Sequence, residues 1–241
     1  MVDVTTAVVT TVRVPRRAER PSLRAMCAAE VSDDRARAQR RALCRVVQEL
    51  HAAGWCWGTS GNFSVTLNRE PMRLLITQSG LDKRNLAMDD FVIVGRDGKP
   101  VAGETGRPSA ETLLHSSIVA ATGAGATLHT HSVASTLVSQ HFCSQGGFTL
   151  SGYEMLKGLE GTTTHEAEVY VPILPNAQAM QPFSQRLDDL LAERPGLHGF
   201  LIAGHGLYTW GASLEQAQRH VEIFEFLLEC TARKTGFQPV S

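Results

Sequence analysis

A short stretch that carries two histidines constrains this chain more than any other feature of its sequence. Residues 126–131 follow a glycine-rich turn at residues 122–125, and apolar and polar side chains alternate along them, which predicts a strand. Side chains two apart on a strand point to the same side, so His129 and His131 project together. Two neutral imidazoles in that arrangement can bind one divalent metal, although such a pair is often a surface feature or a hydrogen-bonded pair near a core.

A third histidine, His205, lies far along the chain between Gly204 and Gly206, where a predicted strand passes into a turn. The flanking glycines would hold a ligand there on a tight backbone with free access. Three protein ligands leave one position open on a zinc-like ion, which is the pattern of a catalytic site rather than a structural one. Three imidazoles would also accept iron, cobalt or manganese, so the pattern indicates a divalent metal without fixing its identity.

The composition is that of an ordinary globular protein, because 43% of the 241 residues are hydrophobic and 20% are charged. The net charge of -1 gives no reason to expect nucleic acid or an anionic membrane as a partner, and no apolar run is long enough to span a bilayer. The five cysteines are scattered and form no Cys-x-x-Cys pair, which argues against a disulfide framework and a thiolate zinc site. We therefore expect a cytoplasmic protein.

The beginning of the chain differs from the rest. Residues 12–24 are rich in arginine and proline and lack the continuous apolar core of a secretory signal. We expect residues 1–32 to form a flexible N-terminal extension and residues 33–241 to form a single domain. Ser32, Asp33 and Asp34 predict the start of the first helix, which would run to about Ala53.

Strands, hairpin turns and amphipathic helices alternate along the remainder of the chain. This pattern predicts an α/β fold of three layers, in which helices cover both faces of a central, mainly antiparallel sheet. The sequence contains neither a Rossmann fingerprint nor a P-loop, which argues against dinucleotide and ATP chemistry.

Three segments rich in small polar residues could present backbone N–H groups and hydroxyls to an anion, although any turn needs similar residues. They contain Thr59, Gly61 and Asn62, then Ser79 and Gly80, and finally Ser109 at the start of a predicted helix, where it could also serve as a cap.

Four other polar residues have simple structural interpretations. Lys83 could add charge to a bound phosphate or simply be exposed. Glu111 and His115 share a helix face and would be read as a surface pair, and Glu154 alone would be read as a solvated helix residue.

Taken together, five motifs resemble the class II aldolase/adducin family in their order and spacing over residues 33–234. They are Gly58-Thr59-Ser60-Gly61-Asn62, Thr77-Gln78-Ser79-Gly80, Pro108-Ser109-Ala110-Glu111, His129-Thr130-His131 and Gly204-His205-Gly206. The resemblance implies a cyclic homotetramer with sites between neighbouring subunits, a small sugar phosphate as substrate, and one Zn²⁺ per subunit. It makes His129, His131 and His205 the zinc ligands. It places the phosphate among Thr59, Gly61, Asn62, Ser79, Gly80 and Ser109.

Within the family, further marks resemble the branch that dehydrates a ketose phosphate in methionine salvage. These marks lie at residues 59–64, 153–158 and 204–211. In that branch the acid/base is the glutamate that matches Glu154, whereas the aldolases use the glutamate that matches Glu111. Ala110 replaces a serine that is common in aldolases, and Ala203 replaces an arginine that is common in the dehydratases. A class II sugar-phosphate aldolase or 4-epimerase, and a non-catalytic adducin-like interaction domain, stand as the alternatives.

Overall fold

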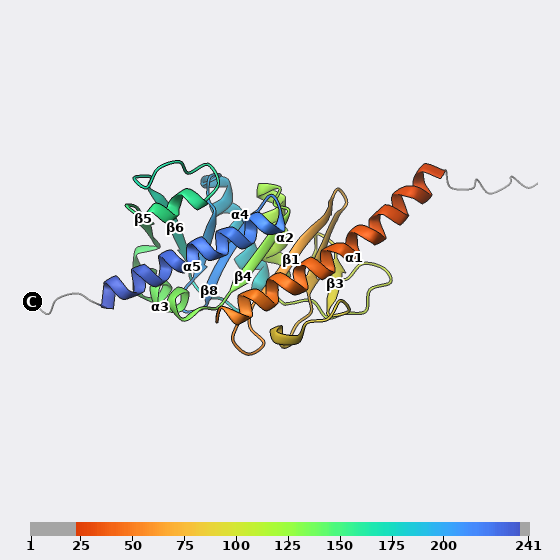
Figure 1. Ribbon diagram of the computed structural model, residues 1–241, viewed down its shortest axis with the longest axis horizontal. Helices are drawn as coiled ribbons and strands as arrows, with labels where there is room; N and C mark the ends of the chain where they lie inside the picture. Colours follow the sequence, from red (N-terminus) through yellow and green to blue (C-terminus); the bar gives the residue numbers. More distant parts are fainter. Residues whose placement is uncertain (1–22, 237–241) are drawn as a thin grey trace, which may run out of the picture.

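An eight-stranded sheet forms the centre of the structure, a computed structural model that describes residues 23–236 (Figure 1). The strands are β1 Asn62–Arg69, β2 Met72–Thr77, β3 Phe91–Val94, β4 Ala126–Thr130, β5 Gly147–Leu150, β6 Val169–Leu174, β7 Gly199–Ile202 and β8 Gly206–Gly211. Their order across the sheet is β3-β2-β1-β4-β8-β7-β6-β5, and every neighbouring pair is antiparallel except β6 and β7. The predicted mainly antiparallel sheet is confirmed.

Helices cover both faces of this sheet, as the sequence predicts. They are α1 Leu23–Ala52, α2 Thr112–Thr122, α3 Val133–Phe142, α4 Met180–Glu193 and α5 Leu214–Gly236, with single turns η1 Lys83–Asn85, η2 Cys143–Gln145 and η3 Glu154–Gly158. In Figure 1, α1 and α5 cross the near face of the sheet, and α2 and α4 lie behind it. One core cluster joins the strands to α2 and α4, and another joins them to α1 and α5.

The central strand β4 shows why the two faces carry different chemistry. Leu128 packs into the core under α1 and α5, so the alternate side chain, His129, points to the face covered by α2. In the sheet register His129 pairs with Asn62 of β1 on one side and with Tyr208 of β8 on the other. Three polar side chains from distant parts of the sequence therefore form one row across the sheet.

The first helix begins earlier than the sequence predicts. It starts at Leu23 rather than beside Asp33, and the residues before Asp33 include Ala, Leu, Met and Glu, which favour a helix and extend it past the local capping signal. Residues 1–22, which hold most of the expected extension, lie outside the described residues. Within residues 23–236, no helix combines the length and apolar character that crossing a bilayer requires.

Candidate metal centre and active site

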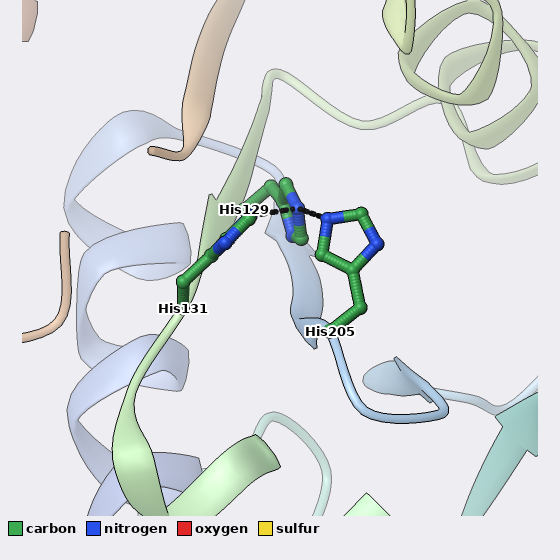
Figure 2. A group of neighbouring side chains, drawn as sticks. All are labelled: His129, His131 and His205. Atoms are coloured by element: carbon green, nitrogen blue, oxygen red, sulfur yellow. Dashed lines mark hydrogen bonds between the residues drawn. The ribbon is translucent and has the colours of Figure 1, made fainter. Parts of the chain in front are cut away.

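The structure brings together the three histidines that the sequence singles out (Figure 2). His129 comes from β4, His131 follows that strand directly, and His205 lies on the turn between β7 and β8. The Nε2 atom of His129 lies 2.8 Å from Nε2 of His131 and 3.3 Å from Nε2 of His205. Two zinc-bound nitrogens in tetrahedral geometry lie roughly 3.4 Å apart, so the cluster has the dimensions of a metal site.

A glycine allows the turn with His205 to reach β4. A Cβ atom on Gly206 would lie 2.0 Å from the carbonyl oxygen of Thr130, so a side chain at this position would separate the two segments. Gly204 has a φ of 63°, in the left-handed region that glycine adopts without strain. The Gly-His-Gly motif therefore allows His205 to lie beside His129 and His131.

Hydrogen bonding and burial keep His129 and His131 in the neutral form that can bind a metal. The Nδ1–H group of His129 donates to the carbonyl of Leu207 at 2.9 Å, which leaves a lone pair on Nε2 facing the other two rings. Burial, followed by the neighbouring histidines, holds the pKa of His129 well below its usual range. Burial and His205 lower the pKa of His131 to about 4. Neutral nitrogens that face one another form a donor set suited to a divalent cation.

Glu111 borders the same triangle, so its interpretation as part of a surface pair is wrong. Its Oε1 atom lies 3.4 Å from Nε2 of His205, and its Oε2 atom lies 3.5 Å from Nε2 of His129. The carboxylate accepts hydrogen bonds from Nδ2 of Asn62 at 2.6 Å and from the hydroxyl of Tyr208 at 3.0 Å. A carboxylate held by two donors beside three histidines that could hold a metal can itself bind a cation or carry a proton.

A buried chain of hydrogen bonds orients the amide of Asn62. His115 is fully buried, and burial lowers its pKa to about 3, so the ring is neutral. Its Nε2 atom bonds to Oδ1 of Asn62, and its Nδ1 atom bonds to the Ser64 hydroxyl at 2.7 Å. The amide oxygen of Asn62 is thus taken by His115, and the amide nitrogen is turned toward Glu111.

The loops predicted to bind phosphate lie close to this row. Gly61 crosses β4 so closely that a Cβ atom on it would lie 2.7 Å from the carbonyl oxygen of His129. Thr59, Ser79 and Gly80 are exposed, so their polar groups are open to a ligand. The hydroxyl of Ser109 accepts a hydrogen bond from the Glu111 amide at 3.2 Å in the turn before α2, but the N-cap residue of α2 is Glu111, so Ser109 does not cap the helix.

Glu154 is not brought to the histidines within one chain. It lies on η3, which packs against α5, and its side chain is 72% exposed. Its partners among the described residues are Lys157 and, at 3.8 Å, Nδ1 of His165. The hydrogen bond from Lys157 lowers the pKa of Glu154.

Two contributors to the site, Tyr208 and Glu225, carried no sequence signal of their own. Tyr208 acquires its role from strand register, which the sequence does not encode locally, and the same register gives Asn62, predicted as a phosphate contact, its place beside Glu111. Glu225 of α5 is buried, and its Oε1 atom accepts a hydrogen bond at 2.7 Å from the hydroxyl of Thr130, the residue between two of the histidines. Burial raises the pKa of Glu225 to about 7.

The fold and this site define a class II aldolase-type protein. The chain belongs to the family described as "Class II Aldolase and Adducin N-terminal domain", which matches residues 41–232. The chain is similar to several relatives named methylthioribulose-1-phosphate dehydratase. The relative from Xanthomonas campestris pv. campestris (strain 8004) is 45% identical over 185 residues, which are 76% of this chain and 83% of the relative. The relative from Stenotrophomonas maltophilia (strain K279a) is 47% identical over 76% of this chain and 85% of its own.

Solved structures show the same architecture. YgbL from Escherichia coli superposes with a TM-score of 0.67 at 25% identity and covers 86% of this chain and 93% of its own. The l-fuculose-1-phosphate aldolase from Thermus thermophilus also has a TM-score of 0.67, at 23% identity, over 85% of this chain and 100% of its own. The family and the α/β fold expected from the motifs are both confirmed.

Proposed function

We propose that this protein is a lyase that dehydrates 5-methylthioribulose 1-phosphate to 2,3-diketo-5-methylthiopentyl 1-phosphate, a step of methionine salvage. Relatives with 41–47% identity carry the name of this dehydratase. The observation that carries the proposal is the triangle of His129, His131 and His205, whose ligand atoms all lie within 4.8 Å of one another. Dehydration beside a ketone needs a site of this kind, because the proton to be removed is only weakly acidic.

His129, His131 and His205 would hold one Zn²⁺ per subunit. The neutral nitrogens facing one another fit a cation of this kind, and they leave part of its coordination sphere open to substrate. When bound, such an ion supplies a Lewis acid that polarises the ketone of the substrate and makes the neighbouring C–H bond more acidic.

Glu154 would then act as the acid/base. Its carboxylate removes the proton from C3, and the electron pair forms the C2–C3 double bond as the C2 carbonyl becomes an enolate. The enolate then restores the C2 carbonyl, its electrons form the C3–C4 double bond, and the C4–O bond breaks as Glu154 delivers the proton to the hydroxyl, which departs as water. The remaining enol takes its dione form by tautomerisation. The lowered pKa of Glu154 keeps its carboxylate ionised at neutral pH, which is the form that a base requires.

Because Glu154 is exposed and separate from the histidines of its own chain, we place it in the site of a neighbouring subunit of a cyclic homotetramer. Three large apolar side chains near the site also favour a partner surface, since Trp57 is 61%, Val133 is 65% and Leu137 is 53% exposed. The phosphate of the substrate would lie among Thr59, Gly61, Asn62, Ser79, Gly80 and Ser109. The described cysteines are free thiols, which favours a cytoplasmic enzyme.

Glu111 favours a second candidate function, a class II sugar-phosphate aldolase or 4-epimerase. It lies 3.4–3.5 Å from two of the histidines, in the position where an aldolase needs its proton carrier. The same activation of a ketone can serve carbon–carbon cleavage. The two reactions are therefore distinguished by which carboxylate, Glu154 or Glu111, transfers the proton.

The test is metal analysis combined with product identification on 5-methylthioribulose 1-phosphate. We expect about one zinc per subunit, formation of the dione, and loss of dehydration in Glu154→Gln with the metal retained. Release of dihydroxyacetone phosphate, lost in Glu111→Gln, would assign the aldolase instead. A purified protein that binds no metal and turns over neither substrate would revive a non-catalytic adducin-like role.

A further inference from the structure

Lys83 occupies an unusual place for a lysine, because only 1% of its surface is exposed although it begins the short turn η1. The interpretation of Lys83 as an exposed side chain is therefore wrong. Lysine is almost never fully buried without a partner, since the ammonium loses its hydration. The contacts of its Nζ atom therefore indicate what stabilises the buried charge.

The ammonium of Lys83 forms hydrogen bonds with both main loops of the proposed phosphate site. Its Nζ atom donates to the carbonyl of Leu81 at 2.9 Å and to the carbonyl of Thr59 at 3.2 Å. Leu81 directly follows Gly80, and Thr59 lies two residues before Gly61, so one bond reaches each loop.

Both acceptors of the Lys83 ammonium are main-chain oxygens. The amides of Ser60 and Ser79 donate to the carbonyls of Trp57 and Arg107. The exposed hydroxyls of Thr59 and Ser79 are therefore the groups of these loops that remain open to a ligand.

No carboxylate among residues 34–236 pairs directly with the ammonium of Lys83, whereas Lys99 and Lys157 each form an ion pair. Burial lowers the pKa of Lys83, and the more distant Asp82 and Asp90 oppose that shift. Carbonyl dipoles solvate the ammonium but leave its net charge in place. A buried cation of this kind is costly unless an anion binds close to it.

We infer that Lys83 is the fixed counter-charge of the substrate phosphate, acting through the two loops that it joins. A sugar phosphate bound in front of these loops carries about two negative charges at neutral pH, and the buried ammonium stabilises them without touching them. This inference rests on the proposed function, because it deepens the phosphate site assigned there. It makes Lys83 a positioning and electrostatic residue, whereas the exposed loop residues make the contacts.

The experiment uses inorganic phosphate as a probe of the zinc-loaded, full-length protein. Lys83→Met removes the charge at similar volume, and Lys83→Gln removes the charge but keeps N–H donors for the two carbonyls. Lys99→Met is the matched control, because it makes the same change of net charge at a side chain that is 79% exposed. Phosphate binding is measured by calorimetry, and KM and kcat are measured with the ketose phosphate.

We expect both Lys83 variants to bind phosphate at least about tenfold more weakly, because a charge in a poorly solvated setting acts over several ångströms. KM should rise by a similar factor while kcat changes less, and Lys99→Met should match the wild type. Unchanged phosphate affinity in a folded Lys83→Met protein would overturn the inference, as would full retention of affinity in Lys83→Gln. If Lys83→Gln does not fold, Lys83 belongs to the loop structure alone, and the inference is likewise overturned.

These outcomes separate the inference from the proposed function. If the wild-type protein dehydrates its substrate and the Lys83 variants bind phosphate as tightly as the wild type, only the inference is contradicted. A wild-type protein that binds phosphate through Lys83 but forms no dione would contradict only the function.

Discussion

The ring of Tyr208 lies flat against the ring of His129, with 3.9 Å between the ring centroids and 12° between the planes. The other face of the Tyr208 ring stacks on Phe200 at 5.0 Å, and its hydroxyl reaches Glu111 at 3.0 Å. Tyr208 therefore fixes the plane of the His129 ring, a proposed metal ligand, and the position of the Glu111 carboxylate at the same time. Its own hydroxyl stays protonated, because burial and Glu111 raise the pKa of Tyr208 well above its usual range.

Tyr208→Phe should separate these two roles. The ring stack is kept, so we expect the metal content and the unfolding temperature to stay close to those of the wild type. Loss of a hydrogen bond to a charged acceptor should lower kcat by about tenfold, since such a bond contributes roughly 1.5 kcal/mol or more. Turnover assays and metal analysis on the same preparation check both parts. A normal kcat would mean that the orientation of Glu111 does not matter for the reaction.

His205→Ala should remove the metal without unfolding the protein. His205 lies on a turn and is only partly buried, so its loss leaves two ligands and costs little packing. We expect zinc after dialysis to fall to roughly a tenth of the wild-type content or less, because two imidazoles bind far more weakly than three. His141→Ala, at an exposed histidine of α3, is the control and should keep its metal. Full zinc content in His205→Ala would contradict the proposed ligand set.

Mixed oligomers test whether Glu154 acts in a neighbouring subunit. His205→Ala and Glu154→Gln subunits are each expected to be inactive alone. When the two are co-expressed in equal amounts in a cyclic oligomer, about a quarter of the sites should combine intact histidines with an intact Glu154, half times half. Recovery of roughly a quarter of the wild-type activity supports the shared site. No recovery, in oligomers that mass spectrometry shows to be mixed, would place Glu154 in the site of its own chain or outside the reaction.

Glu225 should make stability depend on pH in a direction that is unusual for a carboxyl group. Burial raises its pKa to about 7 in the folded protein, against about 4.3 in an unfolded chain. Between these values the folded state keeps a proton that the unfolded state has lost, so stability falls as the pH rises through this window. The full penalty, up to about 3 kcal/mol, is present above pH 7.

Urea unfolding at pH 5 and pH 8 measures this effect. The stability of Glu225→Gln relative to the wild type should be higher at pH 8 than at pH 5, because its side chain does not ionise. The buried histidines, whose lowered pKa values act in the opposite direction, contribute to both proteins alike. Glu222→Gln, at an exposed position of α5 that does not contribute to the raised pKa of Glu225, should behave as the wild type does. Equal pH dependence in wild type and Glu225→Gln would mean that Glu225 is charged in the folded protein.

Much of the metal centre could be predicted from the sequence because its signals are local. Alternation in residues 126–131 fixes which side His129 and His131 face, and glycines mark the turn that holds His205. The mainly antiparallel sheet follows similarly from hairpin-like connections between short strands. The predicted start of α1 is too late in the chain because a capping signal at Ser32 competes with helix-favouring residues before it.

The polar network around Glu111 depends on relationships that a sequence does not display. Asn62 meets His129 only after β1 and β4 are paired in a particular register, and a shift by one residue would turn it to the other face. Glu111 and His115 are interior only because the start of α2 lies over that row. The burial of Lys83 likewise results from the contact of two loops with one turn. The residue type alone predicts the opposite, because lysine is almost never fully buried.

The close passage of Gly61 over β4 has a consequence for substrate length. A Cβ atom on Gly61 would lie 2.7 Å from the carbonyl oxygen of His129, so only a glycine lets the main chain of the loop pass this close to the main chain of the strand. The span from a phosphate held by that loop to a ketone held at the histidines would then be set by main-chain geometry. This fixed span would admit sugar esters whose phosphate and carbonyl are separated by a matching number of bonds, and it would exclude longer or shorter ones.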